Sequence, residues 1–182
     1  MEDFFIWLVL SVPIIVISRR SLLHISSHGF YRFLAWECIL WLIIVNCRYW
    51  FANPLGLAQI FSWIFLLYSL VLLIPAVMLM KKIGKPKLDR QDDTLYVFEK
   101  TSELIQTGVF KYIRHPMYSS LLFLTWGVCL KNPEPTLIII SILSTILLYV
   151  TAKIEEREDV KFFGDKYEEY IKKSKMFVPY VF

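Results

Sequence analysis

The sequence predicts an all-α integral membrane protein with about five transmembrane helices. Hydrophobic residues make up 57% of the 182-residue chain, against about 45–50% in soluble domains. Uncharged runs long enough for membrane helices recur along it, and its Lys and Arg residues gather on one predicted side of the membrane. Disorder and a disulfide-built scaffold are excluded. The six glycines are too widely spaced for a G-x-G-x-x-G or a Walker-type phosphate loop.

We expect the first membrane helix over Phe4–Ser18. The acidic residues Glu2 and Asp3 precede it, and the basic pair Arg19-Arg20 follows it. A signal peptide would show the reverse order of charge and a small-residue cleavage site. The run therefore predicts a membrane helix whose N-terminus lies outside.

The second expected span is Phe30–Cys47. It contains two charged residues, so it crosses the membrane only if Arg32 reaches the interface and Glu37 finds a partner. The third span is Leu57–Met80, which is long enough to cross outright and follows a predicted turn over 53–56.

Two shorter uncharged runs complete the set. They cover Pro116–Leu130 and Pro135–Ala152, and the five residues between them include two prolines. This pattern predicts a tight hairpin of membrane helices. Beyond the third span, the piece 95–98 is expected to be extended.

The distribution of Lys and Arg supports this topology independently. With the N-terminus outside and five spans, the cytoplasmic segments are 19–32, 81–115 and 153–182. They hold 3, 8 and 7 of the 20 Lys and Arg residues, and only Arg48 and Lys131 fall elsewhere. This asymmetry satisfies the positive-inside rule and places the C-terminus in the cytoplasm.

The cysteines and histidines show no metal-site spacing. Cys38, Cys47 and Cys129 fall within or at the ends of apolar runs and are expected to be inert. His24 and His28 lie four residues apart without a nearby carboxylate in the sequence, so we expect them to be interface residues.

Two polar segments of the chain hold the residues that could take part in binding or catalysis. In the first, Pro116 suits the first turn of a helix, which puts Arg114 and His115 at the N-terminus of the fourth span. A helix N-terminus attracts a carboxylate, and Arg114 adds a fixed cation. The pattern is compatible with a binding site for a carboxylate. It is equally compatible with Arg114 as an interface anchor and His115 as a helix cap.

The second polar segment opens with four carboxylates in five residues, at 155, 156, 158 and 159. On a helix Glu155 and Asp159 share a face, and Glu156 lies about 100° round from Glu155. The cluster is either a solvated acidic turn or a site for a cation, a ribose or an amine. Beyond it, Tyr167–Tyr170 indicates an amphipathic helix that we expect against the bilayer surface.

These blocks resemble a known family. The chain reads Thr107-Gly-Val-Phe-Lys-Tyr-Ile-Arg-His-Pro-Met-Tyr118, then a helical hairpin, then Ile154-Glu-Glu156, Phe163-Gly-Asp-Lys-Tyr-Glu-Glu-Tyr170 and Phe-Val-Pro179. This is similar to the isoprenylcysteine carboxyl methyltransferase and phospholipid methyltransferase family of integral membrane enzymes. The resemblance covers about 102–180, under half of the chain.

The resemblance implies S-adenosylmethionine as the cofactor, in a pocket at the cytoplasmic face. The matching cofactor-binding positions are Leu104, Ile105, Phe110, His115, Pro116, Met117, Tyr118 and Glu155. Arg114 and Glu156 would face the reacting centre or hold the closing segment shut. Some positions depart from the family: Phe110 replaces a usual Tyr, Ser120 a common Gly, and Thr151 the substrate-binding Arg of the prenylcysteine enzymes.

The function that follows is methyl transfer to a lipophilic acceptor, either a carboxylate or an amine, with membrane lipids as surroundings. Residues 1–80 would supply the first three transmembrane helices, and residues 81–182 the catalytic region. No nucleic acid and no metal is expected. The membrane is the plasma or inner membrane in a prokaryote and the endoplasmic reticulum in a eukaryote. The alternatives are an NADPH-dependent sterol-type reductase and a non-catalytic lipid-binding membrane protein.

Overall fold

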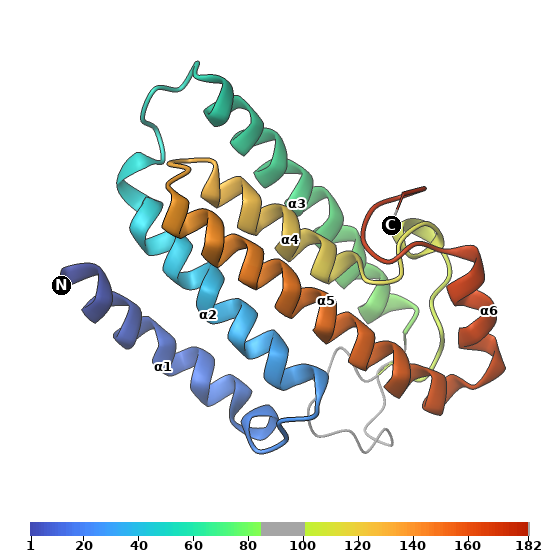
Figure 1. Ribbon diagram of the computed structural model, residues 1–182. Coiled ribbons are helices and arrows are strands. Elements are labelled where there is room, and N and C mark those ends of the chain that lie inside the picture. Colours follow the sequence, from blue (N-terminus) through green and yellow to red (C-terminus); the bar gives the residue numbers. More distant parts are fainter. Residues whose placement is uncertain (85–100, 182) are drawn as a thin grey trace.

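The computed structural model describes residues 1–84 and 101–181. Its helices are α1 (Glu2–Leu22), α2 (His28–Asn46), η1 (Cys47–Tyr49), α3 (Leu57–Lys82), η2 (Gly108–Lys111), α4 (Pro116–Cys129), α5 (Pro135–Phe163) and α6 (Asp165–Lys173). Figure 1 shows α1 to α5 side by side in one bundle, with α6 at one end of it. The extended piece expected over 95–98 lies outside the described residues.

Four of the described helices are long and apolar enough to cross a membrane. They are Glu2–Leu22, His28–Tyr49, Leu57–Lys82 and Pro135–Phe163, and they coincide with the expected first, second, third and fifth spans. The remaining bundle helix, α4, has 14 residues, or about 21 Å, which is short of a hydrocarbon layer of about 30 Å. It still forms the expected hairpin with α5.

The first five helices alternate in direction, so their connections gather at two ends of the bundle (Figure 1). At one end Asp3, near the N-terminus, forms an ion pair with Arg48 at 3.5 Å. At the same end the Lys131 ammonium donates to the Trp50 carbonyl oxygen. The opposite end carries α6 and the polar segments that the sequence singled out.

Small residues bring α3 and α4 close together. The Ser62 hydroxyl donates to the Gly127 carbonyl oxygen at 2.6 Å. A Cβ added at Gly127 would lie 3.0 Å from the Leu66 side chain, with no space to spare. Small residues at helix contacts are typical of membrane bundles, where close packing replaces the hydrophobic drive for helix association.

The charged residues of α2 behave differently from each other. Glu37 has the expected partner, because the Ser11 hydroxyl of α1 donates to its Oε2 at 2.6 Å. Arg32 is only 2% exposed, and its guanidinium lies over the Trp36 ring. Packing against the neighbouring helices covers a side chain that an isolated helix would leave free.

Lys131, one of the two cations expected outside, is held by the protein. Its ammonium donates to the Trp50 carbonyl oxygen at 3.2 Å and to the Gln59 side-chain oxygen at 3.1 Å. It also lies 3.6 Å from the centroid of the Trp63 ring, a favourable cation–π distance. One cation thereby joins the α4–α5 turn to η1 and α3.

Candidate active site

A cavity of about 500 Å³ lies at the α6 end of the bundle. It is lined by Met80, Thr101, Leu104, Ile105, Phe110, Arg114, His115, Glu155, Asp159, Phe163, Tyr167 and Tyr170. That volume includes the open mouth of the cavity. Its wall combines apolar and aromatic side chains with a few charged groups, which is typical of small-molecule and cofactor sites.

A second cavity of about 320 Å³ adjoins the first. It is lined by Met80, Phe110, Arg114, His115, Pro116, Met117, Tyr118 and Glu155. The two cavities together hold nine of the ten residues that the resemblance points to. The exception is Glu156, which lies on a different face of α5 and lines a separate groove. Glu155 and Asp159 do share a cavity, as their spacing of one helical turn predicts.

His115 lies between two carboxylates from α5. It immediately precedes Pro116 at the start of α4, and its side chain is 5% exposed. Its Nδ1 is 3.3 Å from the Glu155 Oε2, and its Nε2 is 3.7 Å from the Glu156 Oε1. The Nε2 atom is buried and makes no hydrogen bond within the described part of the chain.

This cluster sets the charge of its members. Burial lowers the pKa of His115, but the attraction of the neighbouring Glu155 and Glu156 carboxylates outweighs it and raises the pKa to about 9. Both carboxylates lie beyond the uncharged run that ends at Ala152. Burial raises the pKa of Glu155, but His115 and its other partners bring it down to about 2. At neutral pH the site therefore holds an imidazolium between carboxylates.

Arg114 holds the chain around the site together. Its Nε donates to the Glu156 Oε1 at 2.8 Å, and both side chains are only 8% exposed. Its Nη1 donates to the Ile171 carbonyl oxygen at 3.2 Å and to the carbonyl oxygen of Ser174. One guanidinium thus connects α5, the end of α6 and the start of the C-terminal tail.

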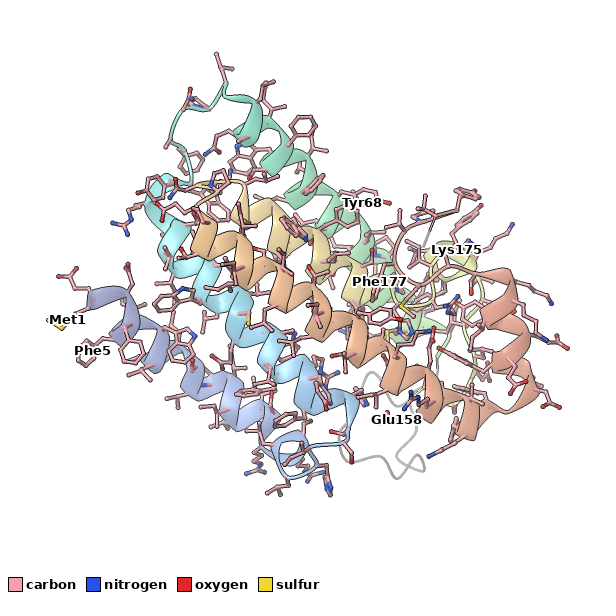
Figure 2. The ribbon with its side chains drawn as sticks, in the orientation of Figure 1. Met1, Phe5, Tyr68, Glu158, Lys175 and Phe177 are labelled. Carbon is pink, nitrogen blue, oxygen red and sulfur yellow. The ribbon has the colours of Figure 1, made fainter. Side chains whose placement is uncertain are left out.

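The tail after α6 runs beside the segment that precedes α4. The Arg114 amide donates to the Lys175 carbonyl oxygen at 2.7 Å, and the Lys175 amide donates to the Tyr112 carbonyl oxygen at 3.0 Å. These bonds form a parallel bridge between Ile113 and Lys175. Figure 2 shows Lys175 and Phe177 at this end of the bundle. The backbone of the site is thereby held in an extended form that a helix start alone would not impose.

The aromatic face of α6 turns toward the cavity. Tyr167 and Tyr170 are 3% and 4% exposed, and the Tyr170 hydroxyl donates to the Phe110 carbonyl oxygen at 2.5 Å. The helix is amphipathic as expected, but placing this face against the bilayer was wrong. The turn at Gly164, with φ +61°, redirects the chain so that the tyrosines close the cavity.

His28 was expected to be an interface residue without a carboxylate partner, and this also was wrong. Its side chain is fully buried, and its Nδ1 lies 2.5 Å from the Glu158 Oε2 of α5. Figure 2 shows Glu158 on α5 near the end of the bundle where α2 begins. The two residues lie 130 positions apart, so no local pattern in the sequence could have paired them.

At two of the positions that depart from the family, the side-chain hydroxyl is hydrogen-bonded within its own helix. Thr151 is fully buried, and its hydroxyl donates to the Leu147 carbonyl oxygen one turn earlier at 2.7 Å. The Ser120 hydroxyl donates to the Met117 carbonyl oxygen at 2.6 Å. Thr151 therefore offers no cation and no free donor where the prenylcysteine enzymes carry their substrate-binding Arg.

Comparison with known proteins identifies the family. The phospholipid methyltransferase family model matches residues 69–166, which is more than half of the chain. This chain belongs to the phospholipid methyltransferase family. The match begins within α3 and ends at the start of α6, so it includes the whole α4–α5 hairpin and the segment that carries His115. The resemblance seen in the sequence is thereby confirmed.

Curated relatives match over a shorter stretch. Methanethiol S-methyltransferase of Pseudomonas deceptionensis is 34% identical over 73 residues, which is 39% of this chain and 26% of the relative. Methanethiol S-methyltransferase 1 of Bradyrhizobium diazoefficiens is 28% identical over 72 residues, 40% of this chain and 25% of the relative. The matched stretch thus spans about a quarter of each relative. No solved structure matches this chain.

The chain therefore combines membership of the phospholipid methyltransferase family with four described helices that are long and apolar enough to cross a membrane. Within residues 1–84 and 101–181, no group of three or more His, Cys, Asp and Glu side chains is placed to hold a metal ion.

Proposed function

We propose that this protein transfers a methyl group from S-adenosylmethionine to a lipophilic acceptor, with the two adjoining cavities as the cofactor site. The observation that carries the proposal is the convergence of residues from four elements on one place. Nine residues that the family resemblance points to line these cavities, although they come from positions 104 to 155. Eight of the nine lie within residues 104–118, and Glu155 joins them from α5.

The residues fit such a cofactor. The buried Nε2 of His115 has no hydrogen-bond partner among the described residues, and a polar ligand would satisfy it. Apolar side chains at Leu104, Ile105 and Phe110 offer a surface for a purine ring. Glu155 and Asp159 are placed on the same wall to accept hydrogen bonds from ribose hydroxyls or an amino group.

The chain then acts mainly by positioning. The bound cofactor supplies an electrophilic methyl group, and an in-line displacement depends on holding two reactants in line and away from water. Arg114 and Glu156 hold α5, α6 and the tail around the cavity. We propose that they also orient the acceptor, because they lie where the cavity and the tail meet. Glu155 is ionised and His115 is protonated at neutral pH, so the site presents both a negative and a positive group to the ligand.

The acceptor class follows from the departures and the relatives. Thr151 is tied to its own helix, so a prenylcysteine carboxylate would lack the cation that binds it in that branch of the family. The curated relatives are named for methylation of methanethiol. We therefore propose a small or lipid-linked thiol as a second candidate acceptor, in addition to an amine. Both need a proton removed before transfer. His115 is already protonated at neutral pH, so we propose that a carboxylate of the cluster, Glu155 or Glu156, takes that proton.

The proposed topology has five membrane crossings, with the N-terminus outside and the active site facing the cytoplasm. The catalytic region is then 81–182, and α4 makes the fourth crossing together with the extended residues before it. Support comes from the segregation of Lys and Arg and from the gathering of the polar segments at the α6 end of the bundle.

A calorimetric titration of the detergent-solubilised protein with S-adenosylhomocysteine tests the function, with NADPH as the parallel ligand. We expect binding of the first ligand only. Glu155→Gln and His115→Asn should each weaken it by about tenfold or more, because each removes a charged partner in a buried site. The exposed Glu168→Gln on α6 is the matched control and should bind normally.

The other outcomes have distinct meanings. Binding of NADPH alone would assign the protein to the reductases. Binding of neither ligand by a folded protein would favour the non-catalytic alternative. Normal binding by both site variants would show that the cofactor lies elsewhere.

A further inference from the structure

A groove separate from the two cavities runs along the outer side of α5. It is lined by Lys153, Glu156, Arg157, Val160, Lys161 and Ile171, and it has a volume of about 950 Å³ including its open mouth. Five of these residues lie on the part of α5 that follows the uncharged run, and the sixth lies on α6. The groove is therefore formed where the end of α5 meets α6.

Three cations line the groove in a regular order. Lys153, Arg157 and Lys161 are four residues apart, so they form one stripe along the helix. The Lys153 ammonium donates to the Glu156 Oε2 at 3.0 Å. Arg157 and Lys161 are exposed and have no ion pair within the described part of the chain. Two positive charges thus line the groove without an ion-pair partner among the described residues.

The groove also lies at the right level for a lipid headgroup. The uncharged run of α5 ends at Ala152, and Lys153 is the first charged residue after it. Each helical turn rises about 5.4 Å, and the headgroup layer is about 5–8 Å deep on each side of the hydrocarbon. Lys153 and Arg157 therefore fall within that layer, with Lys161 one turn further out.

The remaining lining residues suit an amphiphile more than a soluble anion. Val160 and Ile171 are half-buried and line the groove beside the cations, which gives it apolar as well as charged surface. One turn before Lys153, the Tyr149 ring is 39% exposed on the apolar part of α5, with the Lys153 ammonium 6.0 Å from its centroid. Acyl chains can follow this surface while the phosphate stays beside the cations.

We propose that this groove binds the headgroup of an anionic phospholipid, with the phosphate held by Arg157, Lys161 and Lys153. The site is distinct from the cofactor cavities, but it shares one residue with the cluster beside them. Glu156 receives Lys153 on one carboxylate oxygen and Arg114 on the other. A phosphate bound by Lys153 would therefore be linked through Glu156 to Arg114, the residue that holds the C-terminal tail.

The test is lipid binding by the full-length protein in neutral detergent micelles, with phosphatidylglycerol and phosphatidylcholine as the two probes. We expect phosphatidylglycerol to bind more tightly. The pair Arg157→Gln and Lys161→Gln should weaken its binding about 10- to 30-fold, given the usual effect of two cations next to anionic lipid. Binding of phosphatidylcholine should not change, since its headgroup carries no net charge.

The matched control is the pair Lys166→Gln and Lys172→Gln. Both lysines are exposed on α6 and do not line the groove, yet the pair removes the same net charge. An equal loss in both pairs would overturn the proposal and leave only diffuse surface attraction. Displacement of phosphatidylglycerol by millimolar inorganic phosphate would also overturn it, because the groove would then recognise a free anion.

The experiment is independent of the proposed enzyme activity. Arg157 and Lys161 contact neither cofactor cavity, so S-adenosylhomocysteine titration of the groove variants also reports on folding. Loss of lipid selectivity with unchanged nucleoside binding supports the groove site. Failure of S-adenosylhomocysteine to bind any variant, with lipid selectivity intact, would affect only the proposed function.

Discussion

At the scale of single residues, Glu155 and Glu156 show how neighbouring carboxylates acquire different surroundings. Glu155 lines both cavities and faces His115 Nδ1. Glu156 points about 100° away and joins Arg114 to Lys153. Truncating Arg114 would leave Glu156 with Lys153 and His115 as its positive neighbours, so we expect a lower thermal midpoint but a cost below the about 3–5 kcal/mol of a fully unpaired buried charge.

The protonation of His115 predicts how stability depends on pH. Its folded-state pKa of about 9 lies above its ordinary value of 6.5. The stabilising contribution is therefore fully present below about pH 6.5 and is lost as the pH rises through 9. We expect thermal unfolding in detergent to show a decline in stability over this range, equivalent to a loss on the order of 3 kcal/mol.

The control for this prediction is His115→Asn, in which the decline should flatten. The carboxylates act in the opposite direction: their folded-state pKa values of about 2 lie below the ordinary 4.5, so their contribution is lost only as the pH falls from 4.5 through 2. An unchanged alkaline decline in His115→Asn would mean that another group titrates there.

At the scale of elements, α5 connects the apolar bundle to the site. It has 29 residues and extends about 43 Å, so its first part suits the membrane and its last turns carry the carboxylates. The chain then reverses at Gly164, whose φ of +61° and ψ of −142° fall in a region that is nearly exclusive to glycine. This turn decides which way Tyr167 and Tyr170 face.

Gly164→Ala should therefore misplace α6. A Cβ at this position meets nothing within 4 Å, so the cost comes from backbone strain alone, about 1–3 kcal/mol. We expect a lower thermal midpoint together with weaker binding of S-adenosylhomocysteine in calorimetry, because both tyrosines line the cavity.

The matched control for this turn is Glu169→Ala. Glu169 is 69% exposed and, among the described residues, its one ion pair is with Lys173 on the same helix, so its removal should change stability by less than about 0.5 kcal/mol. Equal binding of S-adenosylhomocysteine by wild type and Gly164→Ala would show that α6 does not form part of the cofactor site.

At the scale of the whole molecule, the two ends of the bundle differ in chemistry. One end holds Arg48, which forms an ion pair with Asp3, and Lys131, whose ammonium lies over the Trp63 ring. The other holds the cavities, the tail and the basic groove. This separation agrees with an orientation in which the second end faces the cytoplasm.

Labelling with a membrane-impermeant maleimide tests that orientation. Native Cys47 is exposed, whereas Cys129 is buried, so intact cells should label at Cys47 from outside. In a Cys47→Ser background, Lys166→Cys on α6 should label only after the membrane is opened. The reverse pattern at both positions would invert the topology and place the cavities outside.

The membrane helices could be predicted from the sequence because their signal is local. Three of the four long helices fall where uncharged runs occur, α2 falls on the expected span that contains Arg32 and Glu37, and Pro116 begins α4 as its fixed φ predicts. The site residues were predicted through family resemblance, and the cavities bring nine of them together. His28 and the aromatic face of α6 could not be placed correctly, because their partners come from distant parts of the chain.

The sequence by itself determined the class of the protein, its apolar helices and the motifs that mark its family. These follow from hydrophobicity, charge and spacing, which act over a few helical turns. Only the tertiary structure decided that Arg114 clamps α6 and the tail, that His28 pairs with Glu158, and that α6 closes a cavity. Such contacts depend on which helix faces cross one another, and packing between distant segments sets that geometry.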